Sequence, residues 1–148
     1  MDTAFAKGMF AAREGPSASY AFVSVTTAGR AALWLLDPQR VAPAVEHLAA
    51  AQVHGGWIDA VRMGLEAGRA VLEGRTKEGA TLFTEATTAL RDLEVPFDLA
   101  LTQLDRITVL GADHLDSPAA AEEARAIFER LGAKPFLERL EACRVVAG

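Results

Sequence analysis

Three of the helices predicted for this chain of 148 residues open with an aromatic residue, at nearly constant intervals. Trp57, Phe97 and Phe136 are 40 and 39 residues apart. The apolar residue that closes the preceding helix recurs at similar intervals, as Val53, Leu93 and Leu131. A helix pair repeated with one period is typical of an α-solenoid, in which each unit packs on its neighbours. The alternative is a plain bundle of amphipathic helices of equal length.

Proline, glycine and capping residues divide the chain into about eight expected helices. Asp37 before Pro38, and Ser117 before Pro118, predict helix starts, because Asp and Ser cap a first turn and proline fits its first position. The stretch YAFVSVTT alone suggests a strand, but AGRAALWLL continues it without a break, so we predict a helix there. The expected helices cover residues 2–14, 17–36, 38–53, 57–73, 75–95, 97–111, 118–132 and 135–147.

The turns between these helices are short, which forces successive helices to pack antiparallel. Hydrophobic residues make up 51% of the chain but aromatic residues only 7%, because alanine dominates, and alanine favours closely packed helices over a sheet sandwich. We therefore predict one all-α domain over residues 1–148. It is expected to be a right-handed α-α superhelix, with repeat-like units at residues 17–56, 57–96 and 97–134 and a C-terminal capping helix at residues 135–147.

One segment carries a more specific pattern of small and bulky residues. In LEGRTKEGATLFTEATTALRDL, Gly74 lies in the turn between two helices, and small Gly79, bulky Phe83 and small Ala86 follow along the second helix. This pattern resembles the tetratricopeptide repeat. The resemblance implies that the small residues let the paired helices approach closely while the bulky residue fills the gap beside them. The third unit departs from the pattern.

A wider resemblance covers residues 57–142. The order of AGRAVLEGR, EGATLFTEATTALRDL and EEARAIFERLGAKPFLERLEA is similar to the C-terminal helical repeats of large bacterial multidomain proteins. Those proteins carry an adenylate or guanylate cyclase domain or a transcriptional-regulator domain, then an ATPase, then the repeats. The resemblance implies a regulatory part of a signalling protein, or a free-standing relative of that part. No residue here matches the catalytic positions of those domains.

The chain lacks the residue patterns that catalysis or metal binding requires. A nucleotide-binding P-loop needs a lysine after its last glycine, and GLEAGRA has none and lies within an expected helix, so we interpret its glycines as packing residues. The single cysteine, Cys143, is expected to be a buried structural thiol. His47, His54 and His114 lack the further ligands of a metal site. We expect no catalytic residue, no cofactor and no metal, and hence a protein that is not an enzyme.

The formal net charge is −5, which offers no attraction to nucleic acid or to an anionic membrane. No apolar run reaches the roughly 20 residues that cross a bilayer, and the N-terminus lacks the pattern of a secretory signal. We therefore expect no nucleic-acid partner, no membrane and a cytoplasmic location.

A superhelix of helix pairs is suited to binding, because the first helix of each pair lines a concave surface. The expected lining helices are residues 17–36, 57–73 and 97–111. Apart from Arg30, their candidate partner-binding residues are Asp59, Arg62, Glu66, Arg69, Asp98, Gln103, Asp105 and Arg106. A groove with both signs of charge suits a protein or peptide, or a neighbouring domain of a parent chain. The alternative is that these residues are ordinary solvated exterior.

Two further hypotheses stay open. The first is an effector-sensing domain with a small-molecule pocket between helices, walled by Tyr20, Phe22, Trp34 and Trp57, although core packing is the favoured interpretation of these residues. The second is a homodimer in which the N-terminal helices cover each other. The residues expected at that contact are Phe5, Met9 and Phe10.

Overall fold

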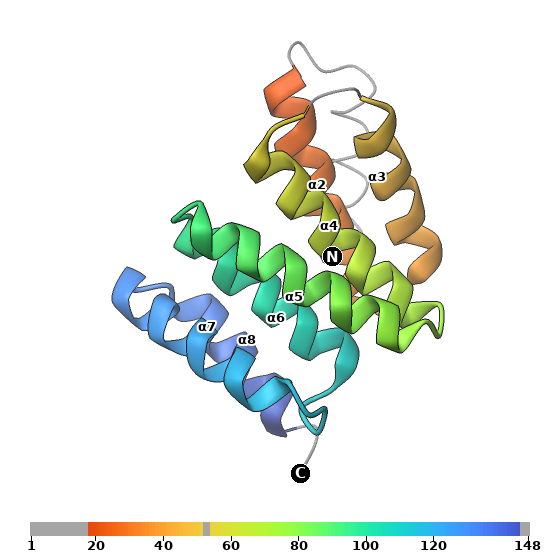
Figure 1. Ribbon diagram of the computed structural model, residues 1–148. Coiled ribbons are helices and arrows are strands. Elements are labelled where there is room, and N and C mark those ends of the chain that lie inside the picture. The colour runs from red at the N-terminus through yellow and green to blue at the C-terminus, as the bar shows by residue number, and fades with distance from the viewer. Residues whose placement is uncertain (1–17, 52–53, 146–148) are drawn as a thin grey trace.

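The computed structural model describes residues 18–51 and 54–145, and these form seven helices and no strand (Figure 1). The helices are α2 (Ala18–Trp34), α3 (Pro38–Ala50), α4 (Gly56–Leu72), α5 (Thr76–Asp92), α6 (Pro96–Leu110), α7 (Ser117–Leu131) and α8 (Lys134–Val145). The all-α class is thus confirmed. The expected helix at residues 2–14, with its proposed dimer contact, and Val53 lie outside the described residues.

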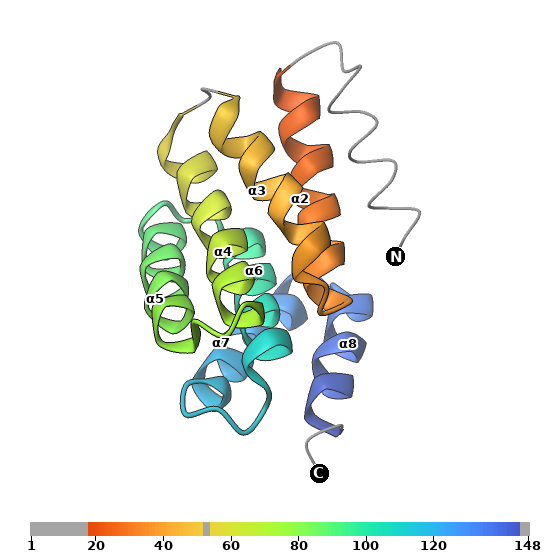
Figure 2. The same cartoon turned by 90° about the vertical axis from the view of Figure 1, so that its right-hand side faces the viewer.

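The helices associate as antiparallel pairs, α2 with α3, α4 with α5 and α6 with α7, and α8 follows alone. Each pair packs on the next, α3 against α4, α5 against α6 and α7 against α8, so the pairs succeed one another across the molecule (Figure 1). Helix α2, the first helix of the first pair, also contacts α6, the first helix of the third pair. The end of α2 reaches the start of α8, where the rings of Trp34 and Phe136 lie 6.4 Å apart (Figure 2).

The stretch that resembles a strand is helical in α2. Its buried apolar residues recur every three or four positions, as Phe22, Val25, Ala28 and Ala32. The Thr26 and Thr27 hydroxyls donate to the carbonyl of Val23 at 3.0 and 2.8 Å. Threonine tolerates a helix when its hydroxyl makes this bond to the preceding turn. Helical burial therefore outweighs the local preference for a strand.

The two expected helix caps differ in outcome. The Asp37 carboxylate accepts from the backbone N–H groups of Gln39 and Arg40, at 3.1 and 3.3 Å, so this N-cap prediction is confirmed. Ser117 is instead the first residue of α7, and Asp116 takes the cap position without a side-chain bond to the helix. The Ser117 hydroxyl donates to the Gly111 carbonyl at 2.6 Å. It closes the loop between α6 and α7 rather than capping α7.

Four helices end with the same reversal, in which a left-handed residue turns the chain. In α4 this residue is Gly74, whose N–H donates to the Val71 carbonyl at 3.0 Å while the following N–H donates to the Ala70 carbonyl at 2.8 Å. This pair of bonds is the Schellman motif. The ends of α2, α5 and α7 repeat it at Leu36, Glu94 and Gly132. Leu36 and Glu94 carry a Cβ in a conformation that favours glycine, so both turns are strained.

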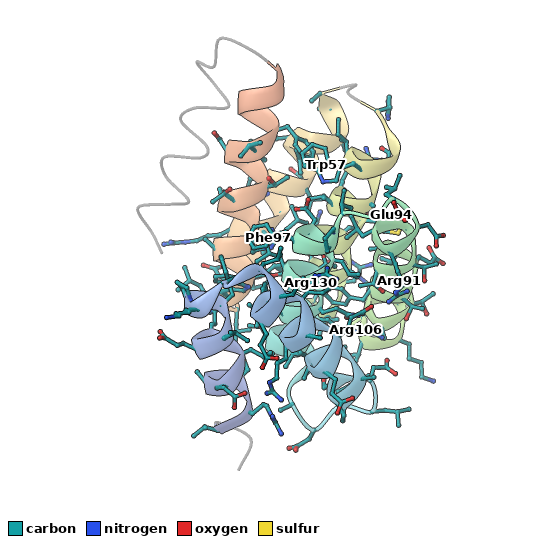
Figure 3. The ribbon with its side chains drawn as sticks, turned by 90° about the vertical axis from the view of Figure 1, so that its left-hand side faces the viewer. Trp57, Arg91, Glu94, Phe97, Arg106 and Arg130 are labelled. Atoms are coloured by element: carbon teal, nitrogen blue, oxygen red, sulfur yellow. The ribbon has the colours of Figure 1, made fainter. Side chains whose placement is uncertain are left out.

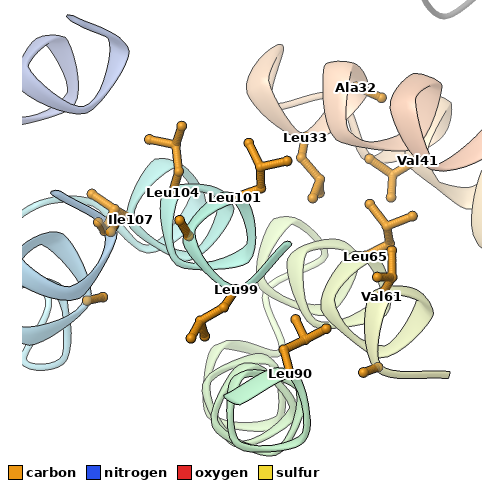
Figure 4. Packing of buried hydrophobic residues seen from close by; sticks show 14 of the residues in the cluster. Ala32, Leu33, Val41, Val61, Leu65, Leu90, Leu99, Leu101, Leu104 and Ile107 are labelled. Carbon is orange, nitrogen blue, oxygen red and sulfur yellow. The ribbon is translucent and has the colours of Figure 1, made fainter. Parts of the chain in front are cut away.

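The hydrophobic core is centred on α6, which α2, α4, α5, α7 and α8 surround (Figure 4). Residues 101–107 of α6 are all buried as a result. Glycines on α4 permit the close approach of its neighbours. A Cβ at Gly68 would lie 2.5 Å from Leu33 Cδ2 of α2, and one at Gly64 would lie 3.1 Å from Thr102 Cγ2 of α6. The prediction that the glycines of GLEAGRA serve packing is confirmed.

The pairing of α4 with α5 depends on one more small residue. A Cβ at Gly79 would lie 2.7 Å from the Ala67 carbonyl oxygen, so the backbones approach as closely as a glycine allows. Phe83 and Ala86, one and two turns further along α5, are fully buried. The three residues singled out in the sequence thus lie on the buried face of α5.

Candidate functional site

The sequence predicts an open groove along the first helices of the pairs. In the structure this side is closed around Asp105. Its side chain is 1% exposed and accepts from Arg30 Nε of α2 and from the indole N–H of Trp34, both at 2.7 Å. The Arg139 guanidinium of α8 lies 4.0 Å from the centre of the Trp34 ring, in a cation–π arrangement. The prediction that Asp105 faces a partner is therefore wrong. It joins three helices inside the protein.

The electrostatics of Asp105 reflect this burial. Loss of hydration raises the pKa of its carboxyl group, whereas the charge of Arg30 and the hydrogen bonds from Arg30 and Trp34 lower it. Burial outweighs these contributions, so the pKa lies above its ordinary value. A buried ion pair of this kind fixes how elements dock, and adds less stability than its geometry suggests.

Gln103 and Arg106 are also buried, on the face of α6 that lies between α5 and α7. They are 4% and 7% exposed. Gln103 Nε2 donates to Glu123 of α7 at 2.6 Å, and an Arg106 Nη group donates to Asp116 at 2.7 Å. Both residues therefore tie α6 to its own partner helix. Neither is available to a second protein.

The remaining candidates divide between two places on the surface. Asp59, Arg62, Glu66 and Arg69 follow one another along α4 at helical spacing. Arg62 lies 3.3 Å from Asp59, and Arg69 lies 2.8 Å from Glu73 and 3.9 Å from Glu46 of α3. Asp59, Arg62 and Arg69 thus take part in local ion pairs, which contribute little each.

Asp98 lies apart from that row, at the start of α6, and accepts from the Trp57 indole at 2.7 Å. The eight candidates consequently form no single surface.

Of the aromatic residues considered for an effector pocket, Phe22 and Trp34 pack in or against the core. Phe22 is 6% exposed and its ring lies 5.0 Å from that of Trp57. Trp34 is held by Asp105, and the side chain of Tyr20 lies outside the described residues. None of Phe22, Trp34 and Trp57 lines the three clefts found in the described part of the molecule.

Four large apolar side chains instead gather at one end of the helix pairs, and we call them the apolar edge. Trp57, Leu93, Phe97 and Leu131 are 39%, 44%, 42% and 47% exposed. Trp57 and Phe97 lie in the first turns of α4 and α6 (Figure 3). Leu93 is the C-cap residue of α5, and Leu131 is the last residue of α7. These are four of the six residues that recur in the sequence, since Phe136 packs against the core and Val53 lies outside the described residues. The repeat was visible in the sequence, but the exposure of these side chains was not.

Each of the first three residues of the apolar edge contacts a residue of a neighbouring helix end. Trp57 is bonded to Asp98, the residue after Phe97. Leu93 lies against the start of α4, where a Cβ at Gly56 would be 3.4 Å from Leu93 Cδ2. The Phe97 ring lies 6.4 Å from that of Phe128, one turn before the end of α7. These contacts connect the helix ends that carry the edge, from α4 to α7.

A cleft of about 420 Å³ opens beside the apolar edge, between α5 and α7. Arg91 crosses from α5 to Glu123 of α7 with two bonds, at 2.9 and 3.0 Å. Burial raises the pKa of Glu123, but the hydrogen bonds from Arg91 and Gln103 lower it more, so it lies below its ordinary value. The lining residues are Leu90, Arg91, Glu94, Val95, Pro96, Leu99, Glu123, Ala126, Ile127 and Arg130.

Two other clefts adjoin each other at the α6–α7 loop, with volumes of about 410 and 500 Å³. They share Ile107, Ala112 and Asp113. Cys143 lines the larger one and is half-buried, with its Sγ atom 3.7 Å from the Thr108 hydroxyl. The expected burial of this thiol is therefore only partial.

None of the described helices, α2 to α8, combines the length and the apolar content that crossing a membrane requires. No group of three or more His, Cys, Asp or Glu side chains among the described residues is placed to hold a metal ion.

Comparison with known proteins assigns no family to this chain. No protein-family model, no curated protein and no solved structure matches the chain. The resemblance to tetratricopeptide repeats and to the ends of bacterial signalling proteins therefore stays a prediction.

Proposed function

We propose that this chain is a non-catalytic protein-interaction module, built as a superhelix of helix pairs similar to tetratricopeptide repeats. The order of the pairs supports this architecture, as does the close approach of α4 and α5 at Gly79. The module serves as a regulatory part of a signalling or transcriptional protein. Its partner is another protein, or a neighbouring domain of a longer chain.

The observation that carries this proposal is the apolar edge. Large apolar side chains scattered singly on a surface are ordinary, whereas a contiguous group marks an interaction site. Tryptophan and phenylalanine at the centre of such a group supply most of the binding energy in protein interfaces. The partner therefore binds across the helix ends at Trp57 and Phe97, and not on the inner side, where Asp105 is enclosed.

Site-specific photo-crosslinking in cells tests the location of the interface. A photoreactive phenylalanine analogue replaces Phe97 in one variant and Leu115 in another. Leu115 is 90% exposed and lies in the loop at the opposite end of α6, so it is a matched control for general encounters. We expect a discrete protein adduct from position 97 and none from position 115. Equal labelling at both positions, or none at position 97, would contradict the proposed interface.

A further inference from the structure

The charges beside the apolar edge indicate what kind of protein covers it. Two arginines and two glutamates line the cleft between α5 and α7. Arg91 and Glu123 neutralise each other across it, at 2.9 Å. Glu94 and Arg130 form no ion pair with any described residue, although they lie on opposite walls of the same cleft (Figure 3). The lining of this cleft thus presents one uncompensated charge of each sign.

The positions of these two charges are set by the turns beside which they lie. Glu94 is the left-handed residue after α5, and its N–H donates to the Arg91 carbonyl at 3.1 Å. Arg130 is in the last turn of α7, next to Leu131 of the apolar edge. Both turns are held by Schellman bonds, so their backbones are fixed before any partner arrives. Little ordering is needed when the surface is covered.

A surface with one acid, one base and an apolar centre is complementary to itself. A two-fold axis through the cleft places Glu94 of one copy opposite Arg130 of the other, and the same pair forms a second time. The apolar edge, which adjoins the cleft on each copy, is then brought to the same interface. A strongly acidic or strongly basic partner would leave one of the two charges facing a like charge, which is unfavourable.

We propose that the partner of the apolar edge is a second copy of this chain. The two copies form a symmetric homodimer in which Glu94 pairs with the partner subunit's Arg130. This inference rests on the proposed function, since it names the protein that the edge binds. It places the dimer contact at the apolar edge and not at Phe5, Met9 and Phe10, which lie outside the described residues.

Charge exchange tests the pairing directly. Sedimentation velocity from micromolar to millimolar concentration is applied to the wild type, Glu94→Arg, Arg130→Glu and the double variant. We expect a wild-type dimer of twice the 15.7 kDa chain mass. Each single variant should weaken dimerisation by about tenfold or more, because it places like charges together twice. The double variant should restore the wild-type affinity. Glu85→Arg, an exposed change of the same charge on α5, should have no effect.

A further variant separates loss of the interface from loss of the fold. Glu94→Gly removes the charge and also relieves the left-handed strain at this residue, where φ is 56°. We expect a weaker dimer whose monomer melts at a higher temperature than the wild-type monomer. A weaker dimer with a lower melting temperature would assign the effect to misfolding and count against the pairing.

The remaining outcomes are also decisive. The homodimer is overturned if the wild-type chain stays monomeric at all concentrations. It is also overturned if neither single charge reversal weakens the dimer. The proposed function is judged separately, by the photoreactive residue at position 97. An adduct with a different protein there keeps the interaction module and rejects self-association. An adduct of two copies supports both.

Discussion

Two aspartates in this protein accept a hydrogen bond from a tryptophan indole at the same distance of 2.7 Å, one inside the protein and one at its surface. Asp105 is 1% exposed and also holds Arg30, whose side chain is 13% exposed. Asp98 binds the exposed indole of Trp57. Replacing each aspartate by alanine therefore measures the effect of burial on one kind of contact. We expect the two changes to differ severalfold in their cost.

The expected magnitude for Asp105→Ala follows from the groups it leaves behind. The Arg30 guanidinium and the Trp34 indole N–H both lose their acceptor in a buried site. Removing one partner of a buried ion pair costs about 3–5 kcal/mol. Burial raises the pKa of Asp105 because its carboxylate is poorly hydrated, and this loss of hydration costs free energy in the wild-type protein. The alanine variant does not bear this cost, which reduces its net loss of stability. We expect about 3 kcal/mol at neutral pH, near the lower limit. Asp98→Ala should cost at most about 1 kcal/mol.

Urea denaturation followed by far-ultraviolet circular dichroism measures both costs, with linear extrapolation to water. For a chain of this size, about 3 kcal/mol corresponds to a fall of roughly 6–12 °C in the thermal midpoint. The pH dependence adds a second readout. Because the folded pKa of Asp105 lies above its unfolded value of 3.8, the part of its contribution that depends on protonation is complete below that value and is lost as pH rises through the folded pKa. The stability difference between wild type and Asp105→Ala should therefore decrease over that range.

Two results would refute this reasoning. One is an equal loss of stability in Asp105→Ala and Asp98→Ala, which would mean that burial does not strengthen the contact. The other is additivity of Asp105→Ala with Arg30→Ala in a double-mutant cycle, since contacting residues in one ion pair must couple.

Three further predictions concern packing, turn strain and acid stability. Gly79→Ala should destabilise the protein by about 1–3 kcal/mol more than Gly56→Ala in urea denaturation, since its Cβ meets the Ala67 carbonyl oxygen at 2.7 Å whereas that of Gly56 meets only a side chain at 3.4 Å. Leu36→Gly should raise the stability by about 1 kcal/mol, because φ is 55° and the side chain is 54% exposed; a loss would disprove strain there. Glu123, whose pKa is lowered, stabilises the fold above its unfolded value of 4.5 and loses this effect as pH falls through the folded pKa. Glu123→Gln should therefore flatten the acid side of the stability profile.

The helices and their order could be predicted from sequence because their causes are local. Proline and glycine at the boundaries, and apolar residues at intervals of three or four, depend only on near neighbours along the chain. The observed bounds of α4 and α6 lie within one residue of those expected. The recurrence of Trp57, Phe97, Leu93 and Leu131 was also visible, since it needs only counting. Where two local signals conflicted, as in α2, continuity with the rest of the helix decided correctly.

The position of each charge relative to solvent was decided by tertiary structure alone. Asp98 and Asp105 are seven residues apart on the same helix, yet one faces solvent and the other is enclosed. The difference arises because α2 crosses α6 beside Asp105, where Arg30 and Trp34 meet it. The sequence of α6 does not indicate where α2 crosses it. Helical spacing identifies the residues that share a face of a helix. Whether that face is exposed or buried depends on helices from distant parts of the sequence that pack against it.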